Sequence, residues 1–183
     1  MSTNPTTGRI LLAEPGIQDF YFKQSVILLG EMDGDGAFGL IVNKRTNIRF
    51  GDVINDHHGL NPYIYLGGPV RSQNLFFIHR ISDLPGCNQI TKGVYWGGDS
   101  ELMYQMIQNN IVTDNEVRFF LGYSGWTPNQ LENEIVEKSW RITDMNANQI
   151  FNQAQNHLWE EEMVRINPSY KVWFNMPSDI MNN

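Results

Sequence analysis

The sequence has 183 residues, of which 41% are hydrophobic and 12% aromatic, and its formal net charge is -7. A chain of this length and composition buries about 70% of its unfolded surface, which excludes an intrinsically disordered protein. The acidic balance argues against non-specific nucleic-acid binding, which depends on Lys and Arg side chains that neutralise phosphates. We therefore expect one globular domain over residues 1–183, with an ordered core at about 8–173, and no direct nucleic-acid binding.

Cysteine content and hydropathy limit the cell compartment. Cys87 is the single cysteine, so one chain forms neither an internal disulfide nor a Cys-x-x-Cys redox pair. Residues 1–8 lack the charged start and apolar core of a secretion signal, and the apolar runs fall short of the ~20 residues that span a bilayer. These features predict a soluble cytoplasmic protein without a membrane segment.

The first elements in chain order are predicted to be strands. Residues 10–13 are apolar and end before Pro15 and Gly16, which indicates a short buried strand. Residues 25–31 and 37–42 are also apolar, and Asp33-Gly34-Asp35-Gly36 between them tolerates the backbone angles of a tight turn. This pattern predicts a β-hairpin.

The middle of the chain mixes short elements. Phe50, Val53 and Ile54 are spaced for one or two helical turns, and residues 63–66 return to a strand pattern. The turn at Gly67-Gly68-Pro69 then predicts a hairpin-like pairing of that strand with a second strand at 75–79.

Another helix is predicted shortly before the central strand. A loop is expected at 82–88, a short strand at 94–96, and a helix from Asp99 or Ser100 to about Asn110. Residues 117–123 then alternate as a strand, and Gly122, Ser124 and Gly125 are expected to break it.

The helix after this break is expected to begin at Thr127, with Pro128 at its first position and Gln130 completing a capping box. A strand at 140–142 and one helix over 147–163 follow, and the last fifteen residues look irregular. The pattern predicts an α+β fold with a mixed or largely antiparallel sheet, flanked by helices, that could curl into a barrel.

Several motifs suggest chemistry, but each fails in part. Gly122-Tyr123-Ser124-Gly125-Trp126 resembles a nucleophile elbow, yet Trp126 stands where that turn needs glycine, and His157 is the one histidine later in the chain. A tight turn that packs Trp126 into the core is the favoured alternative to a hydrolase.

Metal and phosphate sites are not predicted. The acidic turn at Asp33 has Ala37 and Lys44 where a calcium loop needs oxygen ligands. The four histidines lack metal-ligand spacing, and Gly67-Gly68-Pro69-Val70 lacks the Lys of a phosphate loop. We expect no metal and no cofactor.

Three segments together resemble one protein family. They are GRILLAEPGIQDFYFKQSVILLGEMDGDGAFGLIVNK, GGPVRSQNLFFIH and LGYSGWTPNQLENEIVEKSW. In order and spacing they look like the signatures of the AlgH/YqgE-like proteins, a bacterial family of unsettled function, over residues 8–173. The chain departs from the family pattern at Gln24, commonly arginine, and at Asn129, often glycine, which weakens a charge-based account of the first loop.

The resemblance implies a cytosolic α/β domain with a curled sheet and a part in transcriptional regulation, but it transfers no catalytic residue. The positions that it marks as candidates for ligand or partner binding are Ser25, Asn43, Gly67, Gly68, Pro69, Ser124, Gly125, Trp126, Gln130, Glu134 and Trp140.

Two functional hypotheses follow from the sequence. The first is a non-enzymatic regulatory protein that binds a protein or small-molecule partner around residues 123–127, where small residues leave room and free helix amides could receive an anion or a carboxylate. The alternative is a hydrolase that uses Ser124 with His157. The sequence does not identify the partner or the oligomeric state.

Overall fold

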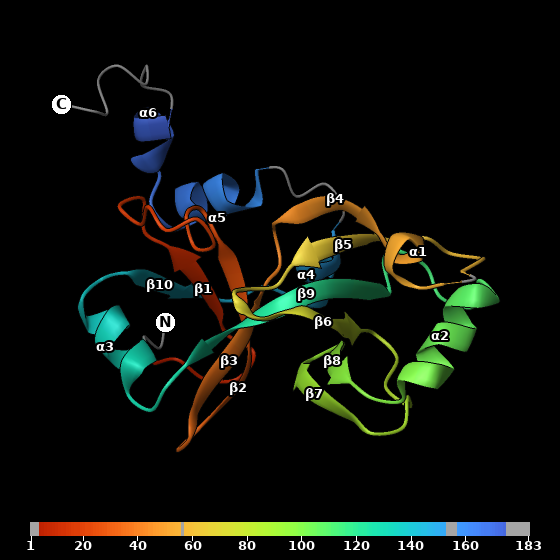
Figure 1. Ribbon diagram of the computed structural model, residues 1–183. Coiled ribbons are helices and arrows are strands. Elements are labelled where there is room, and N and C mark those ends of the chain that lie inside the picture. Colours follow the sequence, from red (N-terminus) through yellow and green to blue (C-terminus); the bar gives the residue numbers. More distant parts are fainter. Residues whose placement is uncertain (1–3, 56, 153–156, 175–183) are drawn as a thin grey trace.

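One continuous sheet forms the centre of the computed structural model, which describes residues 4–55, 57–152 and 157–174 (Figure 1). Its strands are β1 (Ile10–Ala13), β2 (Val26–Asp33), β3 (Gly36–Ile41), β4 (Arg45–Arg49), β5 (Tyr63–Leu66), β6 (Val70–His79), β7 (Cys87–Thr91), β8 (Val94–Gly97), β9 (Val117–Trp126) and β10 (Trp140–Thr143). The helices are α1 (Phe50–Val53), α2 (Ser100–Gln108), α3 (Gln130–Val136), α4 (Ala147–Phe151), α5 (Leu158–Ile166) and α6 (Tyr170–Phe174).

The sheet is mixed but largely antiparallel, as the sequence predicted. Its strand order is β10-β1-β2-β3-β9-β6-β8-β7, and β4 and β5 branch from β9. β5 runs parallel to β9, whereas the other described pairs are antiparallel. Among the described residues no pairing joins β10 to β7, so the sheet does not close into the barrel that the sequence allowed.

The sheet forks along one edge of β9. On the other edge, β6 pairs with most of the length of β9. On the forked edge, residues 119–121 pair with β5 and residues 124–126 pair with β3. β5 and β3 therefore pair with successive parts of the same edge of β9 and then diverge. Where they separate, the chain that follows β5 must pass very close to the β9 backbone.

Gly67 occupies this crossing, which we define by Gly67, Gly68, Gly122 and Ser124. The Gly67 amide donates to the Leu121 carbonyl at 2.8 Å, and the Gly67 carbonyl accepts from the Ile41 amide at 3.0 Å. A Cβ atom on Gly67 would collide with the carbonyl oxygen of Gly122, which itself has a φ of 68°. Only glycine allows the two backbones to approach this closely.

A buried arginine connects the two branches of the fork. Arg118 is 1% exposed, and its guanidinium donates to the carbonyls of Val42 at 2.9 Å and Asn152 at 3.0 Å. The same group lies 4.3 Å from the ring centroid of Tyr65. Burial lowers the pKa of Arg118 to about 10, so the side chain stays charged at neutral pH. Val42 follows β3, Tyr65 lies in β5 and Asn152 follows α4, so one cation contacts both branches and the end of α4.

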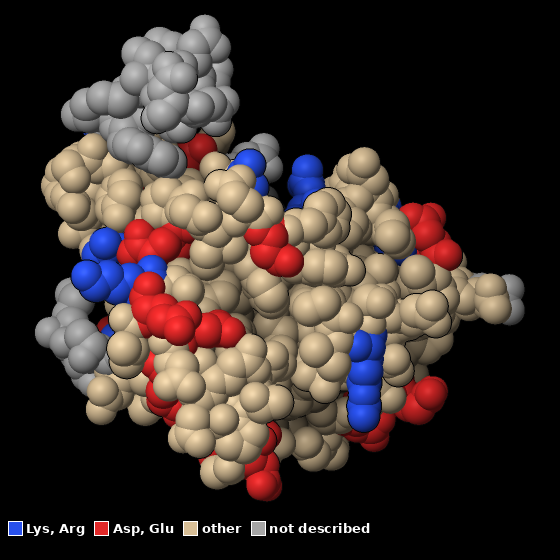
Figure 2. All heavy atoms as spheres, turned by 60° about the vertical axis from the view of Figure 1, so that its left-hand side comes forward, with Lys and Arg blue, Asp and Glu red and all other residues tan. Residues whose placement is uncertain are grey.

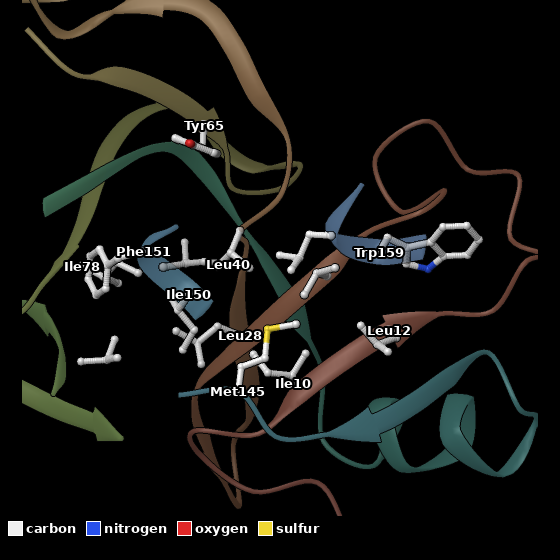
Figure 3. Close-up of a cluster of buried hydrophobic side chains, with 14 of the residues drawn as sticks. Ile10, Leu12, Leu28, Leu40, Tyr65, Ile78, Met145, Ile150, Phe151 and Trp159 are labelled. Carbon is white, nitrogen blue, oxygen red and sulfur yellow. The ribbon is translucent and has the colours of Figure 1, made fainter. Parts of the chain in front are cut away.

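Three apolar clusters surround the sheet. The largest lies between the sheet and helices α4 and α5 and includes Ile10, Leu28, Leu40, Phe151 and Trp159 (Figure 3). A second, which contains Leu131 of α3, covers the opposite face near β1 and β2. A third packs α1 and α2 against β5 and β9. Among the described residues, no helix has the length and apolarity needed to cross a bilayer.

Several predicted elements are confirmed, including the strand at Ile10–Ala13, the β2–β3 hairpin and the helix at Ser100–Gln108. The predicted hairpin of β5 with β6 is wrong, because β9 lies between these strands and pairs with both. The strand at Cys87–Thr91 was not predicted. It begins within the predicted loop at 82–88 and pairs with β8.

Two predictions for the C-terminal part of the chain are also wrong. The single helix over 147–163 is two helices, because α4 ends at Phe151 and Asn152 has an extended ψ of 126°. The predicted irregular end contains α6, Tyr170–Phe174, which packs against α5 and stacks Tyr170 on Phe174. The rest of that predicted end, 175–183, lies outside the described residues.

The predicted break in β9 is absent as well. β9 continues through Gly122 to Trp126, because residues 124–126 find hydrogen-bonding partners in β3. The following helix begins at Gln130 rather than Thr127, after Asn129 adopts a φ of 63°. The Gln130 side chain accepts from the Thr127 amide at 3.0 Å, so the expected capping interaction forms ahead of the helix.

His79 is a buried neutral histidine at the end of β6. Its Nδ1 accepts from the Ile81 amide at 3.2 Å, which leaves the proton on Nε2, 2.9 Å from the Gly97 carbonyl oxygen. Burial lowers the pKa of His79 below its ordinary value of 6.5, and the two backbone hydrogen bonds oppose this change less strongly.

The first prediction concerns this pKa. As the pH falls below about 6.5, the unfolded chain protonates His79 while the folded protein resists it, so the unfolded state binds more protons and stability falls. His79→Gln should be less stable than wild type at pH 7.5 but should lose less further stability at pH 5.5, as measured by urea unfolding. Equal losses in both proteins would contradict the neutral assignment.

The second prediction concerns the crossing. Gly67→Ala should lower the free energy of unfolding by at least about 2 kcal/mol, because the added methyl group must displace the Gly122 backbone. Gly16→Ala is the matched control, since a Cβ there meets no atom within 4 Å. The control should change stability by less than about 1 kcal/mol in the same urea titration. Similar values for both variants would refute the steric account of Gly67.

Candidate functional site

The residues that the sequence marked as a site are dispersed over the fold. Ser25 and Asn43 lie beside the loop before β2, whereas Gly67, Gly68 and Ser124 form the crossing. Pro69 is exposed between β5 and β6. Among the marked side chains, those of Asn43, Ser124 and Gln130 bond to backbone groups.

Asn43 fastens the loop before β2. Its Oδ1 accepts from the Val26 amide at 2.8 Å, and its Nδ2 donates to the Gln24 carbonyl at 2.9 Å. Beside it, the Lys44 ammonium donates to the Tyr21 carbonyl at 2.7 Å, and burial lowers the pKa of Lys44. Ser25 is fully buried next to this loop. A hollow of about 300 Å³ lies here, and Lys44 lines it. The Lys44 ammonium is already bound to the Tyr21 carbonyl.

Ser124 is fully buried within β9, and its hydroxyl donates to the Gly67 carbonyl at 3.2 Å. A serine nucleophile must reach a substrate, and an elbow lifts it out of a strand end. Here the strand continues and the hydroxyl ties β9 to the crossing. His157 lines the separate hollow near Lys44, where its Nδ1 is 3.3 Å from Glu160 Oε2. This geometry does not favour the serine hydrolase.

Four more of the marked residues form the Glu134 cluster, defined by Trp126, Gln130, Glu134 and Trp140. Glu134 Oε2 accepts from the indole nitrogens of Trp126 at 2.9 Å and Trp140 at 2.7 Å. Its Oε1 accepts from the Gln130 amide nitrogen at 2.9 Å. Both indoles are buried, so the carboxylate satisfies donors that solvent hardly reaches. The cluster anchors α3 to β9 and β10.

The region around Gly125 opens into a second hollow. The hairpin groove, about 440 Å³, is lined by the β2–β3 hairpin (Glu31, Asp33 and residues 35–38), by Val70, and by Tyr123 and residues 125–127. The β2–β3 hairpin projects beyond the rest of the sheet, and the groove lies along one of its faces (Figure 1).

Strand register explains why the sheet is hollow here. Residues directly opposite each other in antiparallel strands project from the same face. Glu31 lies opposite Phe38, and Phe38 lies opposite Gly125. Asp33 lies opposite Gly36 in the same way. At Gly125 this face carries no side chain, and a Cβ there would meet nothing nearer than the Tyr123 and Val70 side chains at 3.4 and 3.5 Å, so the groove opens above this glycine. Gly36 also lines the groove, but the backbone of Trp126 occupies the place of its side chain.

Aromatic rings form one wall of the groove. The Phe38 ring lies 4.8 Å from the Trp96 ring and 6.1 Å from the Tyr123 ring, which it meets edge-on. Phe76 stacks on Trp96 at 5.6 Å and meets Tyr123 at the same distance. Phe38 and Tyr123 line the groove and are only partly buried, so their apolar surface remains open to a ligand, and Phe76 and Trp96 support them from behind.

The charge of the groove contradicts the expected anion site. Glu31, Asp33 and Asp35 are exposed along its rim and would repel an anion or a carboxylate. The Thr127 amide is bound by the Gln130 side chain, so it does not face the groove as a free donor for an anion. Acidic side chains are also more widespread than basic ones on the face shown in Figure 2.

The three acidic residues of the groove were not predicted as site residues. Asp33 and Asp35 were assigned to a turn and Glu31 to a strand. The alternate spacing of Glu31 and Asp33 was an available signal, since residues i and i+2 of a strand share a face, whereas Asp35 lies in the turn after β2. Phe38 could not be assigned to the groove without the register of β3 against β9.

A third prediction tests the Glu134 cluster. Glu134→Ala should lower the free energy of unfolding by about 2–4 kcal/mol, because two buried indole N–H groups lose their acceptor. Glu132→Ala, on the exposed side of α3, is the control and should stay within about 0.5 kcal/mol of wild type. Chemical denaturation followed by tryptophan fluorescence measures both. A Glu134→Ala protein as stable as the control would show that the cluster contributes little.

Comparison with known proteins places this chain among similar sequences. A family model described as AlgH-like (DUF179) matches residues 10–171. A UPF0301 protein of Cytophaga hutchinsonii is 38% identical over 176 residues, which cover 95% of this chain and 97% of that protein. A UPF0301 protein of Bacteroides thetaiotaomicron is 35% identical over 175 residues, with 94% and 89% covered.

Solved structures share the fold. The solution structure of the AlgH protein from Pseudomonas aeruginosa matches with a TM-score of 0.73 at 21% identity, and it covers 97% of this chain and 98% of that one. A crystal structure of a Corynebacterium diphtheriae protein matches with a TM-score of 0.74 at 22% identity and 90% coverage of both chains. From the family model and these relatives, the chain belongs to the AlgH-like family.

Proposed function

We propose that this protein is a non-enzymatic binding protein with a regulatory role, and that it docks a protein partner in the hairpin groove. The observation that carries the proposal is the open hollow of about 440 Å³ beside Gly125, walled by the partly exposed rings of Phe38 and Tyr123. Concave surfaces with exposed aromatic groups are typical of binding sites.

The same site offers little for catalysis. The hydroxyl of Ser124 is buried against Gly67, and the groove lining among the described residues contains no histidine, cysteine or lysine. The groups that the groove does present are carboxylates, aromatic rings and backbone. Such a set can recognise a partner by shape and charge, so binding without chemistry is the simpler function.

A regulatory role would act through protein contacts. The net charge of -7 and the acidic rim of the groove disfavour contact with DNA phosphates. We therefore assign any part in transcriptional regulation to recognition of another protein. We also propose that this occurs in the cytoplasm, where the single Cys87 would stay reduced.

The fourth prediction uses a photo-crosslinking amino acid in cells of the natural host. Placed at Thr127, on the groove, it should capture a defined protein; placed at Asp83, equally exposed but between β6 and β7, it should not. Adding Gly125→Val to the Thr127 protein should abolish the capture, because the new side chain fills the groove. A Cβ at Gly125 meets its nearest atoms at 3.4 and 3.5 Å, so the fold should tolerate this change.

Two results would contradict the proposal. One is capture of the same proteins from both positions. The other is capture at Thr127 that persists in the Gly125→Val protein while its circular dichroism spectrum remains that of wild type.

A further inference from the structure

The chemistry of the hairpin groove specifies its partner more narrowly. Glu31, Asp33 and Asp35 lie within five residues of one another on its rim, and the described part of the lining contributes no basic side chain. The ion pairs identified among the described residues join other groups, so none of them neutralises these carboxylates. Three unpaired like charges beside one hollow create a local negative potential that attracts a cationic ligand.

The spacing of the carboxylates fits an extended segment. Glu31 and Asp33 alternate along β2, and strand geometry puts such positions about 7 Å apart. Alternate side chains of an extended peptide have the same spacing. A partner lying along the hairpin could therefore present basic side chains in register with the acidic ones, which a small isolated cation cannot do.

The apolar wall suits the stems of basic side chains. Lys and Arg carry three or four methylene groups below their charged heads, and these stems pack on apolar surface while the head stays polar. Phe38, Val70 and Tyr123 provide such a surface beneath the acidic rim. Elsewhere in this chain, the guanidinium of Arg49 lies 3.8 Å from the ring centroid of Tyr63, so the same pairing is already present within the fold.

We propose that the hairpin groove binds an extended protein segment that carries Lys or Arg at alternate positions. The basic heads pair with Glu31, Asp33 and Asp35, and the stems lie over Phe38 and Tyr123. This inference rests on the proposed function, because it names the chemistry of the partner for the same groove. The hollow over Gly125 leaves room for the segment, and the acidic rim selects it by charge.

The test uses fluorescein-labelled ten-residue peptides of Gly and Ser with three Lys at alternate positions, or with three Glu or three Leu at the same positions. Anisotropy titrations compare wild type with a groove variant, Glu31→Gln, Asp33→Asn and Asp35→Asn. The amide introduced by Asp33→Asn keeps the oxygen that accepts from the Asp35 amide at 2.8 Å. The control variant, Asp83→Asn, Glu101→Gln and Glu161→Gln, also removes three negative charges, but from exposed positions outside the groove.

The Lys peptide should bind wild type and the control variant with affinities within about twofold, and the groove variant at least about tenfold more weakly. The Glu and Leu peptides should bind no better than the groove variant binds the Lys peptide. Binding to wild type should also weaken as salt is raised, because exposed charges are screened. Equal weakening in both triple variants, or no preference for the Lys peptide, would overturn the inference.

The two proposals can fail separately. If crosslinking at Thr127 depends on Gly125 but the captured partner binds wild type and the groove variant equally, the groove is a docking site for a partner of different chemistry. The inference of a basic segment then falls and the proposed function stands. If Gly125→Val leaves both the crosslinking and the Lys peptide binding intact, both proposals fall.

Discussion

The close approach of Gly67 to Gly122 is the constraint on which the rest of the sheet depends. It lets one edge of β9 serve two strands, β5 and then β3, that run in opposite directions. The Gly67 amide and carbonyl bond to both β9 and β3, so the junction is hydrogen-bonded rather than merely packed. Any side chain at position 67 would separate these backbones and release both branches.

Arg118 deals with the polar groups that such a fork leaves inside the protein. A buried carbonyl without a donor costs about 1–3 kcal/mol. The guanidinium supplies donors for Val42 and Asn152 and lies over Tyr65, so it bridges β3, β5 and the end of α4. Its burial as a cation is compensated by these contacts rather than by a carboxylate.

The fork also explains how the binding surface arises. Because β3 joins the far end of β9, the β2–β3 hairpin extends beyond the other strands and carries Glu31, Asp33 and Asp35 on an exposed face. Gly125 leaves that face hollow beside the rings of Phe38 and Tyr123. Ser124, one residue from Gly125, points its hydroxyl into the crossing instead. Neighbouring residues of one strand thus serve the fold and the groove in alternation.

Local sequence patterns predicted the elements that local interactions determine. The strand at Ile10–Ala13 and the β2–β3 hairpin follow from apolar runs and the Asp-Gly turn between them. The continuation of β9 through Gly122 could not be predicted, because it depends on a partner strand more than eighty residues away. The β5–β6 hairpin was wrong for the same reason, since β9 inserts between two strands that are adjacent in sequence.

The site was predictable only in part. A hollow does lie beside Gly125, but buried Ser124 and half-buried Glu134 bond to other groups of the fold, and their polarity alone could not distinguish a structural from a binding role. The acidic residues of the hairpin were recognisable as a turn, and their position on the groove rim required the register of β2 with β3. Tertiary pairing therefore determined which polar residues face solvent and which hold the fork.

Native-state hydrogen exchange of individual amides tests the central claim most directly. The amides of Gly67 and Ile41 report on the crossing, Leu29 reports on β1 and β2 beyond the β3 branch, and Arg80 reports on the pairing of β6 with the other edge of β9. If the sheet on both sides of β9 depends on one crossing, Gly67 and Ile41 should exchange only through global unfolding, with the same denaturant dependence as Leu29 and Arg80. Exchange of Gly67 and Ile41 through a smaller local opening, while Leu29 and Arg80 stay protected, would contradict this account.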